Sequence, residues 1–491
     1  MTNTILQPKN HANDRLVPFS SKFAFGVGQY AEGLKNTAFS LFILFYYNQV
    51  LGLSGTLAGM ALFIALLFDA ITDPLAGSLS DNLKSKFGRR HPFMYASAIP
   101  LALAFVGLFS PPESMGQWGL FFWLTIFAIL TRAAMTLYHV PHLALGAELT
   151  ENFQERTRIV AFRQFFGTFG NASAVVIGLG YFFADEHGGR LDSANYMPYA
   201  ITLGVLMVIT IWYSAIGTQK EIPHLFVPAS KPDSKILPRV AKEAREAFRN
   251  QSFRWLFFGV LIVFIMSGVN AALDLYMFQY FWELSGSEML MVQVTYMVGL
   301  MLGVFFTATL HRYTDKKFGV ILGTGAWALF QVLPVVLRLF DLMPANNDPT
   351  LVYLLIAMKF VQGLLLQQAF ISFGSMMADV ADEHEFETGV RQEGIFFGAI
   401  SFSAKATSGF GSFIGGVSLD LISWPTGSGI KSAADIPPDT LMNLGLVYGP
   451  FVSAFAIVSL WCYTHYHLTR ERHQEILTVL HERRAKNQTQ K

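Results

Sequence analysis

The chain reads LAGMALFIALLFDAITDPLAGSL over residues 57–79. This run carries no charge except at Asp69 and Asp73, and it exceeds the roughly 20 apolar residues that a helix needs to cross the hydrocarbon core of a bilayer. It therefore predicts a membrane-spanning α-helix. An ionised carboxylate at the centre of such a helix costs about 2.5–3.5 kcal/mol, so both aspartates need a positive partner.

The overall composition agrees with a membrane protein. The 491 residues are 52% hydrophobic and 14% charged, whereas a soluble domain is about 25% charged. The net charge of +1 argues against the basic surface of a nucleic-acid-binding protein. Cys462 is the single cysteine, which excludes an internal disulfide and a cysteine-based metal site.

Twelve apolar runs of spanning length divide into six before residue 218 and six after it. The predicted spans are 24–50, 57–79, 92–110, 117–147, 160–184, 197–217, 254–282, 289–310, 319–340, 350–378, 392–420 and 443–467. We expect an all-α integral membrane protein of about 12 helices in two six-helix bundles.

Charge distribution sets the expected orientation. The segments that would lie inside are rich in Lys and Arg, as at Lys86 and Arg89, whereas the loop 51–56 has no charge. The positive-inside rule then places both termini in the cytoplasm of a multi-pass protein in the cell (inner or plasma) membrane. The expected segments are an N-terminal tail 1–22, a bundle 23–217, a cytoplasmic linker 218–252, a bundle 253–468 and a C-terminal tail 469–491.

Two short motifs recur between the halves. Residues 147–150 (AELT) are echoed by 378–381 (ADVA), and Asp81 with its following basic residues is echoed by Asp315. Two matches at nearly one spacing predict an internal repeat, with the solute site between the repeats near the middle of the membrane.

The most specific stretch is residues 68–74 (FDAITDP), followed by Gly77, Asp81 and residues 87–92 (FGRRHP). With these motifs the chain resembles the glycoside-pentoside-hexuronide:cation symporters of the major facilitator superfamily. The resemblance implies a monomeric transporter whose two bundles rock about a central site. It also implies that a small-molecule sugar and a coupling ion, H⁺ or Na⁺, enter together, with no cofactor.

Asp69 and Asp73 are the candidate cation site. Four residues apart, they share one helix face, and a proton or a monovalent cation such as Na⁺ would relieve both their burial and their mutual repulsion. The family resemblance adds the hydroxyls of Thr72 and Thr136. Two alternatives stay open: Asp73 braces the bend before Pro74, or both aspartates pair with Arg132.

Candidate solute contacts are polar residues inside other spans, together with Phe370, which stands where the family resemblance implies a Trp that stacks on the sugar. They are Glu32, Asn36, Arg132, His139, Arg163, Asn270, Phe370 and Lys405. Gly33 and His139 stand where the family's melibiose-type pattern has acidic sugar ligands, so an α-galactoside is not expected. His139 with Lys405 would suit an anionic sugar such as a uronide. Alternatively, Lys405 and Arg163 pair with carboxylates such as Glu32, and Asn270 holds a bend.

Charged residues at the expected cytoplasmic ends are candidate gates. Their ion pairs would close this side of the transporter in the outward-open conformation and break in the other conformation. They are Asp81, Arg89, Arg90, Glu148, Arg156, Asp379, Asp382 and Arg391. The alternative is that they only direct membrane topology.

Three other functions compete with sugar–cation symport. A transporter for an amphiphile such as a lysophospholipid would need a wide apolar slot open to the bilayer. An uncoupled facilitator would keep its activity after Asp73→Asn. An enzyme is not expected, because the chain has no GxSxG, no HExxH and no P-loop motif.

Overall fold

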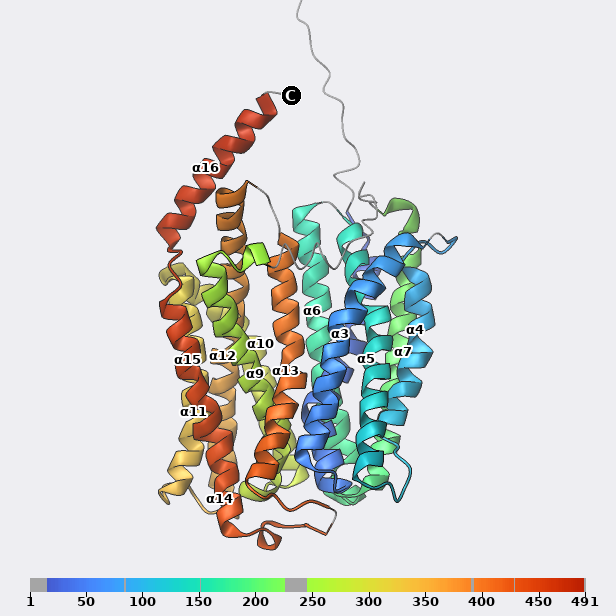
Figure 1. The fold of residues 1–491 in the computed structure, drawn as a ribbon, viewed down its shortest axis with the longest axis vertical. Helices are drawn as coiled ribbons and strands as arrows, with labels where there is room; N and C mark the ends of the chain where they lie inside the picture. Colours follow the sequence, from blue (N-terminus) through green and yellow to red (C-terminus); the bar gives the residue numbers. More distant parts are fainter. Residues whose placement is uncertain are drawn as a thin grey trace, which may run out of the picture.

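The computed structural model describes residues 16–83, 85–150, 152–225, 245–389, 393–427 and 429–489, and all regular elements in these ranges are helices. Figure 1 shows long helices standing side by side in one body. We call the end at which α16 lies, uppermost in Figure 1, the termini end. The other end, where α14 begins, is the opposite end.

The first half holds six long helical segments, several of them extended by π-helical turns. The label η marks both π-helical and 3-10 turns. They are α1 (Phe19–Thr37) with η1 (Ala38–Phe42), α2 (Ile43–Phe45) and η2 (Tyr46–Val50); α3 (Gly55–Asn82); α4 (His91–Leu108); α5 (Gln117–Glu148); α6 (Phe153–Ile177) with η3 (Gly178–Phe182); and α7 (Tyr196–Gln219). Short 3-10 turns η4 (Asp185–His187), η5 (Ser193–Asn195) and η6 (Ile222–His224) flank α7.

The second half repeats this plan. Its elements are α9 (Gln251–Tyr276) with η7 (Met277–Phe281); α10 (Gly286–Tyr313); α11 (Lys316–Leu339); α12 (Pro349–Thr388); α13 (Glu393–Leu421); the 3-10 turn η8 (Ala433–Asp435); α14 (Pro438–Leu446) continued by η9 (Val447–Phe451) and α15 (Val452–Thr464); and α16 (Arg470–Thr489).

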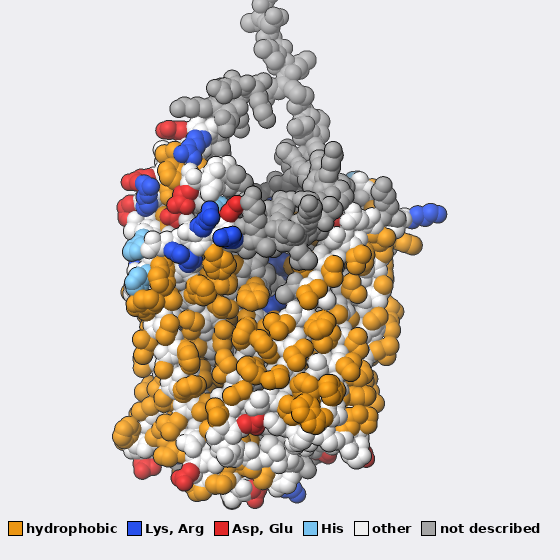
Figure 2. Space-filling view, in the orientation of Figure 1, with side chains coloured by type: hydrophobic (Ala, Val, Ile, Leu, Met, Phe, Trp, Pro, Cys, Tyr) orange, Lys and Arg blue, Asp and Glu red, His pale blue; other side chains and the backbone are white. Residues whose placement is uncertain are grey.

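Within the described residues, ten helices have the length and hydropathy of a membrane span. The α1–η2 segment and α13 complete the six long segments of each half, and they carry charged side chains such as Lys35 and Lys405. Figure 2 shows a band of apolar side chains around the middle of the visible face, with charged side chains gathered near its two ends. The predicted all-α membrane fold is confirmed.

The tenth membrane helix is longer than predicted. The tenth span was expected to end near residue 378, but α12 continues to Thr388 and ends at Gly389, whose φ of 73° makes it a left-handed C-cap. Asp379 and Asp382 therefore lie in a helix and not in a loop. Arg391 and residues 226–244 of the expected linker lie outside the described residues.

The same helix pairs pack in both halves. In the first half α1 packs on α6 and α7, α3 on α5, and α4 on α5 and α7. The corresponding pairs of the second half are α9 with α13 and α15, α10 with α12, and α11 with α12 and α15. The contacts between halves, α3 with α13 and α6 with α10, are also equivalent by this repeat. The structure therefore has the internal symmetry that the sequence motifs predicted.

Small residues bring the halves together between α3 and α13. A Cβ added to Gly59 would lie 2.5 Å from the Ser412 carbonyl oxygen, and one added to Gly416 would lie 2.0 Å from the Gly55 carbonyl oxygen. Gly411 makes an equally close approach to Gly268 of α9. Helix α13 thus packs closely on both halves because two of its faces lack side chains there.

Candidate functional site

Asp69 on α3 is held by a guanidinium from α5. Its Oδ2 accepts hydrogen bonds from Arg132 Nε at 3.0 Å and Nη2 at 2.6 Å, and both side chains are buried. Arg132 Nη1 donates to the Ser408 hydroxyl of α13 at 3.2 Å. This pairing is one of the alternatives that the sequence left open, and it applies to Asp69 but not to Asp73.

Asp73 forms an ion pair with a lysine of the other half of the protein. Its Oδ2 forms an ion pair with Lys405 of α13, and its Oδ1 accepts a hydrogen bond from the Thr136 hydroxyl of α5 at 2.9 Å. Lys405 Nζ also lies 3.7 Å from Asp69 Oδ2. Two cationic side chains therefore face the two carboxylates, and one of them crosses between the halves.

Two oxygens near this pair have no hydrogen-bond partner among the described residues. They are Asp69 Oδ1 and Thr72 Oγ1, and both are buried. An unmet buried acceptor costs about 1–3 kcal/mol. Thr72 makes no hydrogen bond to either aspartate, so the structure places Thr136 but not Thr72 in direct contact with the acid pair.

A second charged group lies on α1. Glu32 forms an ion pair with His139 Nδ1 of α5 at 2.7 Å and accepts a hydrogen bond from Gln29. Lys35 is buried one turn along, 5.9 Å from the centre of the Phe39 ring, which Arg132 also approaches at 5.8 Å. Lys35 has no ion pair with any described carboxylate.

The remaining candidate solute contacts are scattered. Arg163 of α6 forms no hydrogen bond or ion pair with the described residues, although Glu32 is close enough to influence it electrostatically. Asn36 is exposed. Phe370 stacks on Phe264 with ring centres 5.0 Å apart, so one of its faces is already covered. Asn270 lines a separate cavity.

At the termini end, Glu148 forms ion pairs with the basic residues Arg89 and Arg90, which follow α3. Its Oε1 lies 2.9 Å from Arg89 Nη2 and 2.7 Å from Arg90 Nη2, and Arg90 also contacts Asp81 at 2.5 Å. Arg156, expected in the same network, instead donates to the Ala147 carbonyl at 3.4 Å. All these contacts stay within the first half.

The equivalent network of the second half involves α16. Lys316 pairs with Asp379 at 2.7 Å, and His473 of α16 lies 3.1 Å from Asp382 and 3.6 Å from Asp379. Among the described residues, no hydrogen bond or ion pair joins this network to Glu148 and its partners. The described members of the two candidate gates therefore form no bond that joins the halves in this conformation.

The halves meet instead at the opposite end. Asp420 of α13 accepts hydrogen bonds from the Ser54 hydroxyl at 2.6 Å and from the backbone N–H groups of Gly55 and Thr56 at 2.9 and 2.8 Å. A carboxylate from one half thus caps the first turn of α3 in the other, where the helix dipole favours negative charge. The conformation is closed at this end.

We predict that Asp420→Asn weakens this closure. Hydrogen bonds to a charged group are worth about 1.5–3 kcal/mol, and about 1.4 kcal/mol is a tenfold change. In a Cys462→Ser background, Ser412→Cys places a reporter thiol in the buried contact between α3 and α13. Labelling of this thiol by an impermeant maleimide added at the opposite end should accelerate about tenfold.

The control for this experiment is Asp435→Asn. Asp435 lies at the same end, but among the described residues it bonds only to its neighbours Lys431 and Ser432. Equal labelling rates in the Asp420 and Asp435 variants would show that the Asp420 cap does not hold the halves together.

Some functional residues were missed from the sequence. Ser408 and Asp420 lie on the same helix as Lys405, but nothing in the spacing indicated that they reach across to the first half. Tyr448 bonds to Asp274 inside the second half. For Asp420, the available signal was an acidic residue at the end of a span, directly after the small residues that permit close packing.

Comparisons with known proteins identify the family and the fold. A family model described as MFS/sugar transport protein matches residues 24–470. The chain is 24% identical to an uncharacterized symporter from Synechocystis sp., over 96% of this chain and 98% of that protein. It is also 24% identical to the isoprimeverose transporter of Lactiplantibacillus pentosus, with 84% and 82% covered.

A glucuronide carrier protein homolog from Escherichia coli is likewise 24% identical, with 94% of this chain and 96% of the relative covered. Among solved structures, the inward open xylose transporter of E. coli aligns with a TM-score of 0.61 at 15% identity, over 94% of this chain and 99% of that one. This likeness shows the fold, and the family match covers most of the sequence. The chain therefore belongs to the MFS/sugar transport protein family of the major facilitator superfamily.

Proposed function

We propose that the protein is a secondary active transporter that carries a sugar or glycoside together with H⁺ or Na⁺ by alternating access. The observation that carries the proposal is the Asp73–Lys405 ion pair, which joins the two halves beside the Asp69–Arg132 pair. A ligand shifts a conformational equilibrium only by binding the two states differently. An ion that replaces Lys405 at Asp73 meets this condition, because it removes a contact between the halves.

Either coupling ion fits the residues present. A proton needs only the Asp73 carboxylate. Na⁺ prefers several oxygen ligands, and here they would be Asp69 Oδ1, the Asp73 carboxylate and the hydroxyls of Thr72 and Thr136. The described residues contain no group of three or more His, Cys, Asp or Glu able to hold a metal, so Na⁺ binding would depend on these hydroxyls and on the withdrawal of Lys405.

The proposed solute class rests on the relatives and on charge. Two relatives are named for isoprimeverose and for a glucuronide. In this chain His139 is paired with Glu32 and Lys405 with Asp73, so these two side chains are not free for an anionic solute. Lys35 and Arg163 have no described ion-pair partner, and they now support the uronide hypothesis in their place.

Orientation and assembly are part of the proposal. Lys86, Arg89, Arg90, Lys316 and Lys317 all lie at the termini end, which the positive-inside rule places in the cytoplasm. The closed end is then extracellular, which corresponds to an inward-facing conformation in the proposed transport cycle. Residues 23–217 and 253–468 would move as the two halves of a monomer, joined by residues 218–252.

An uncoupled facilitator is the second candidate, and one observation favours it. Arg132 and Lys405 already neutralise Asp69 and Asp73, so the carboxylates do not require an additional cation. The lysophospholipid alternative gains less support, because an ion pair and several amide side chains line the cavity beside Asn270, and these groups suit hydroxyl groups better than an acyl chain.

The proposal is tested with purified protein in proteoliposomes and a panel of labelled sugars and glycosides. Uptake is measured under an imposed Na⁺ gradient, an imposed H⁺ gradient and no gradient. Symport predicts that one ion gradient drives accumulation above equilibrium. Equilibration at the same rate in all three conditions would instead identify a facilitator, and no uptake of any panel member would refute sugar transport.

A further inference from the structure

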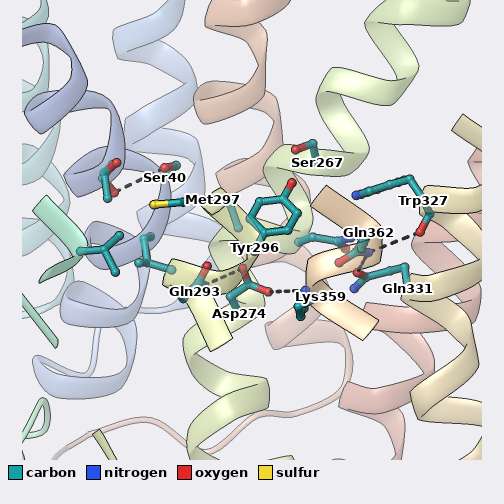
Figure 3. Close-up of a pocket in the computed structure, with 15 residues that line it drawn as sticks. Ser40, Ser267, Asp274, Gln293, Tyr296, Met297, Trp327, Gln331, Lys359 and Gln362 are labelled. Atoms are coloured by element: carbon teal, nitrogen blue, oxygen red, sulfur yellow. Dashed lines mark hydrogen bonds and ion pairs between the residues drawn. The ribbon is translucent and has the colours of Figure 1, made fainter. Parts of the chain in front are cut away.

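A cavity of about 150 Å³ lies between the halves, apart from the aspartate pair. Thr37, Ser40 and Leu41 of the α1–η1 segment line it from the first half, and α9, α10, α11 and α12 line it from the second. Ser40 belongs to the π-helical turn η1, a feature that is often found at functional sites. Figure 3 shows the polar side chains of this cavity.

The charged groups in the wall of the cavity satisfy one another. Asp274 accepts a hydrogen bond from the Tyr448 hydroxyl. It also accepts one from Gln293 at 3.1 Å, and Lys359 Nζ lies 3.8 Å from its carboxylate (Figure 3). Lys359 also donates to Tyr448 at 3.1 Å and lies 5.7–5.9 Å from the centres of three aromatic rings. The wall is therefore polar but has no net charge, which favours a neutral ligand.

Side-chain amides supply the remaining polarity. Asn270 is 5% exposed, and neither its amide nitrogen nor its amide oxygen has a hydrogen-bond partner among the described residues. The nitrogens of Gln293 and Gln362 donate to Asp274 and to Gln331, whereas their oxygens accept no bond from the described residues. An amide can both donate and accept, and a sugar hydroxyl has the same capacity.

The size of the cavity suits one sugar ring. An apolar cavity of about 150 Å³ admits a benzene ring in another protein, so a six-membered ring fits in this volume. At about 30 Å³ per water molecule, the same space holds about five waters when no solute is bound. Ring hydroxyls can replace such waters without loss when they reproduce their hydrogen bonds.

The cavity is also within reach of the charged group on α1. Eight residues separate Ser40 from Glu32, which is about 12 Å along a helix. Lys35 lies between them and shares the Phe39 ring with Arg132. A solute that touches both the cavity and the charged residues must be about two sugar rings long.

We propose that this cavity is a second sugar subsite, which binds a neutral, hydroxyl-rich ring of a two-ring glycoside through the amide of Asn270 and the carbonyl oxygens of Gln293 and Gln362. The other unit of the solute lies against Lys35, Arg132 and Glu32. This inference rests on the proposed function and specifies its substrate class: a glycoside or disaccharide in preference to a free monosaccharide.

The test compares mono- and disaccharide uptake in proteoliposomes containing the full chain. Wild-type protein is screened with labelled hexoses, pentoses, isoprimeverose, melibiose and hexosyl glucuronides under both ion gradients. The best monosaccharide and the best disaccharide are then measured with Asn270→Leu. We expect the KM for the disaccharide to rise at least tenfold more than the KM for the monosaccharide.

Thermal unfolding separates binding from a structural role. A buried amide without partners is costly, so Asn270→Leu should unfold at the wild-type temperature or above it. Ser453→Ala, which removes another unpartnered buried group that does not line the cavity, is the matched control and should change neither KM. Ligand-free destabilisation by Asn270→Leu would assign the residue to packing and overturn the subsite.

The other outcomes are also decisive. Equal losses for both solutes, or none, would overturn the subsite, as would a wild-type protein that carries monosaccharides only. In these cases sugar transport itself would stand. Absence of any sugar uptake by the wild type would refute the proposed function and the subsite together.

Discussion

Asp73→Asn is expected to abolish gradient-driven accumulation while leaving downhill movement of the solute. One positive charge entering with the solute gains about 2.3 kcal/mol per 100 mV, which supports roughly 40-fold accumulation at about 1.4 kcal/mol per tenfold. An amide at this position neither takes up a proton nor balances the charge of Lys405. The inside-to-outside ratio in proteoliposomes at −100 mV should therefore fall to about 1, with counterflow still measurable.

Two further variants make this result specific. Asp439→Asn makes the same chemical change at an exposed position of α14 and should accumulate solute like the wild type. The double variant Asp73→Asn with Lys405→Gln removes the ion pair without leaving an unpaired charge. If the pair were only structural, the double variant would regain accumulation, and the proposed coupling role of Asp73 would be wrong.

Arg132→Ala is expected to destabilise the protein severely. Asp69 and Arg132 are both buried and are joined by two hydrogen bonds. Removing one partner of a buried ion pair costs about 3–5 kcal/mol, because the other charge is left uncompensated. Thermal unfolding of the detergent-solubilised protein should show a large decrease in melting temperature, and the yield of folded protein should fall with it.

A compensating variant distinguishes packing from transport. Adding Asp69→Asn to Arg132→Ala removes the orphaned charge and should restore much of the lost stability, but not transport. Arg132→Lys keeps the charge but loses the fork of N–H donors that reaches Asp69 and Ser408, so we expect an intermediate melting temperature. Equal stability of Arg132→Ala and the double variant would show that Asp69 is not held as an ion in the folded protein.

These predictions share one physical basis. Lys405 and Ser408 lie on α13, whereas Asp69, Asp73 and Arg132 lie on helices of the first half. The polar contacts between halves thus run from the acid pair to the Asp420 cap at the opposite end. Movement of α13 away from α3 must break these contacts, so ion binding at the acid pair and closure of the opposite end are mechanically linked.

The sequence by itself determined the membrane class, the positions of the long helices and the presence of a repeat. Apolar runs of spanning length report directly on burial in lipid, because the bilayer sets how many residues a helix needs. The motif around Asp69 and Asp73 likewise identified the family. Because these two residues are four positions apart on a helix, their carboxylates share a face.

Only the tertiary structure decided which basic side chain pairs with which carboxylate. Asp69 pairs with Arg132, Asp73 with Lys405, Glu32 with His139, and Glu148 with Arg89 and Arg90. Partners on different helices depend on how far each helix is rotated and shifted against its neighbours, and spacing along one helix does not contain that information. For the same reason, the sequence shows Asn270 as a polar residue inside a span, but the cavity beside it arises only where helices of both halves meet.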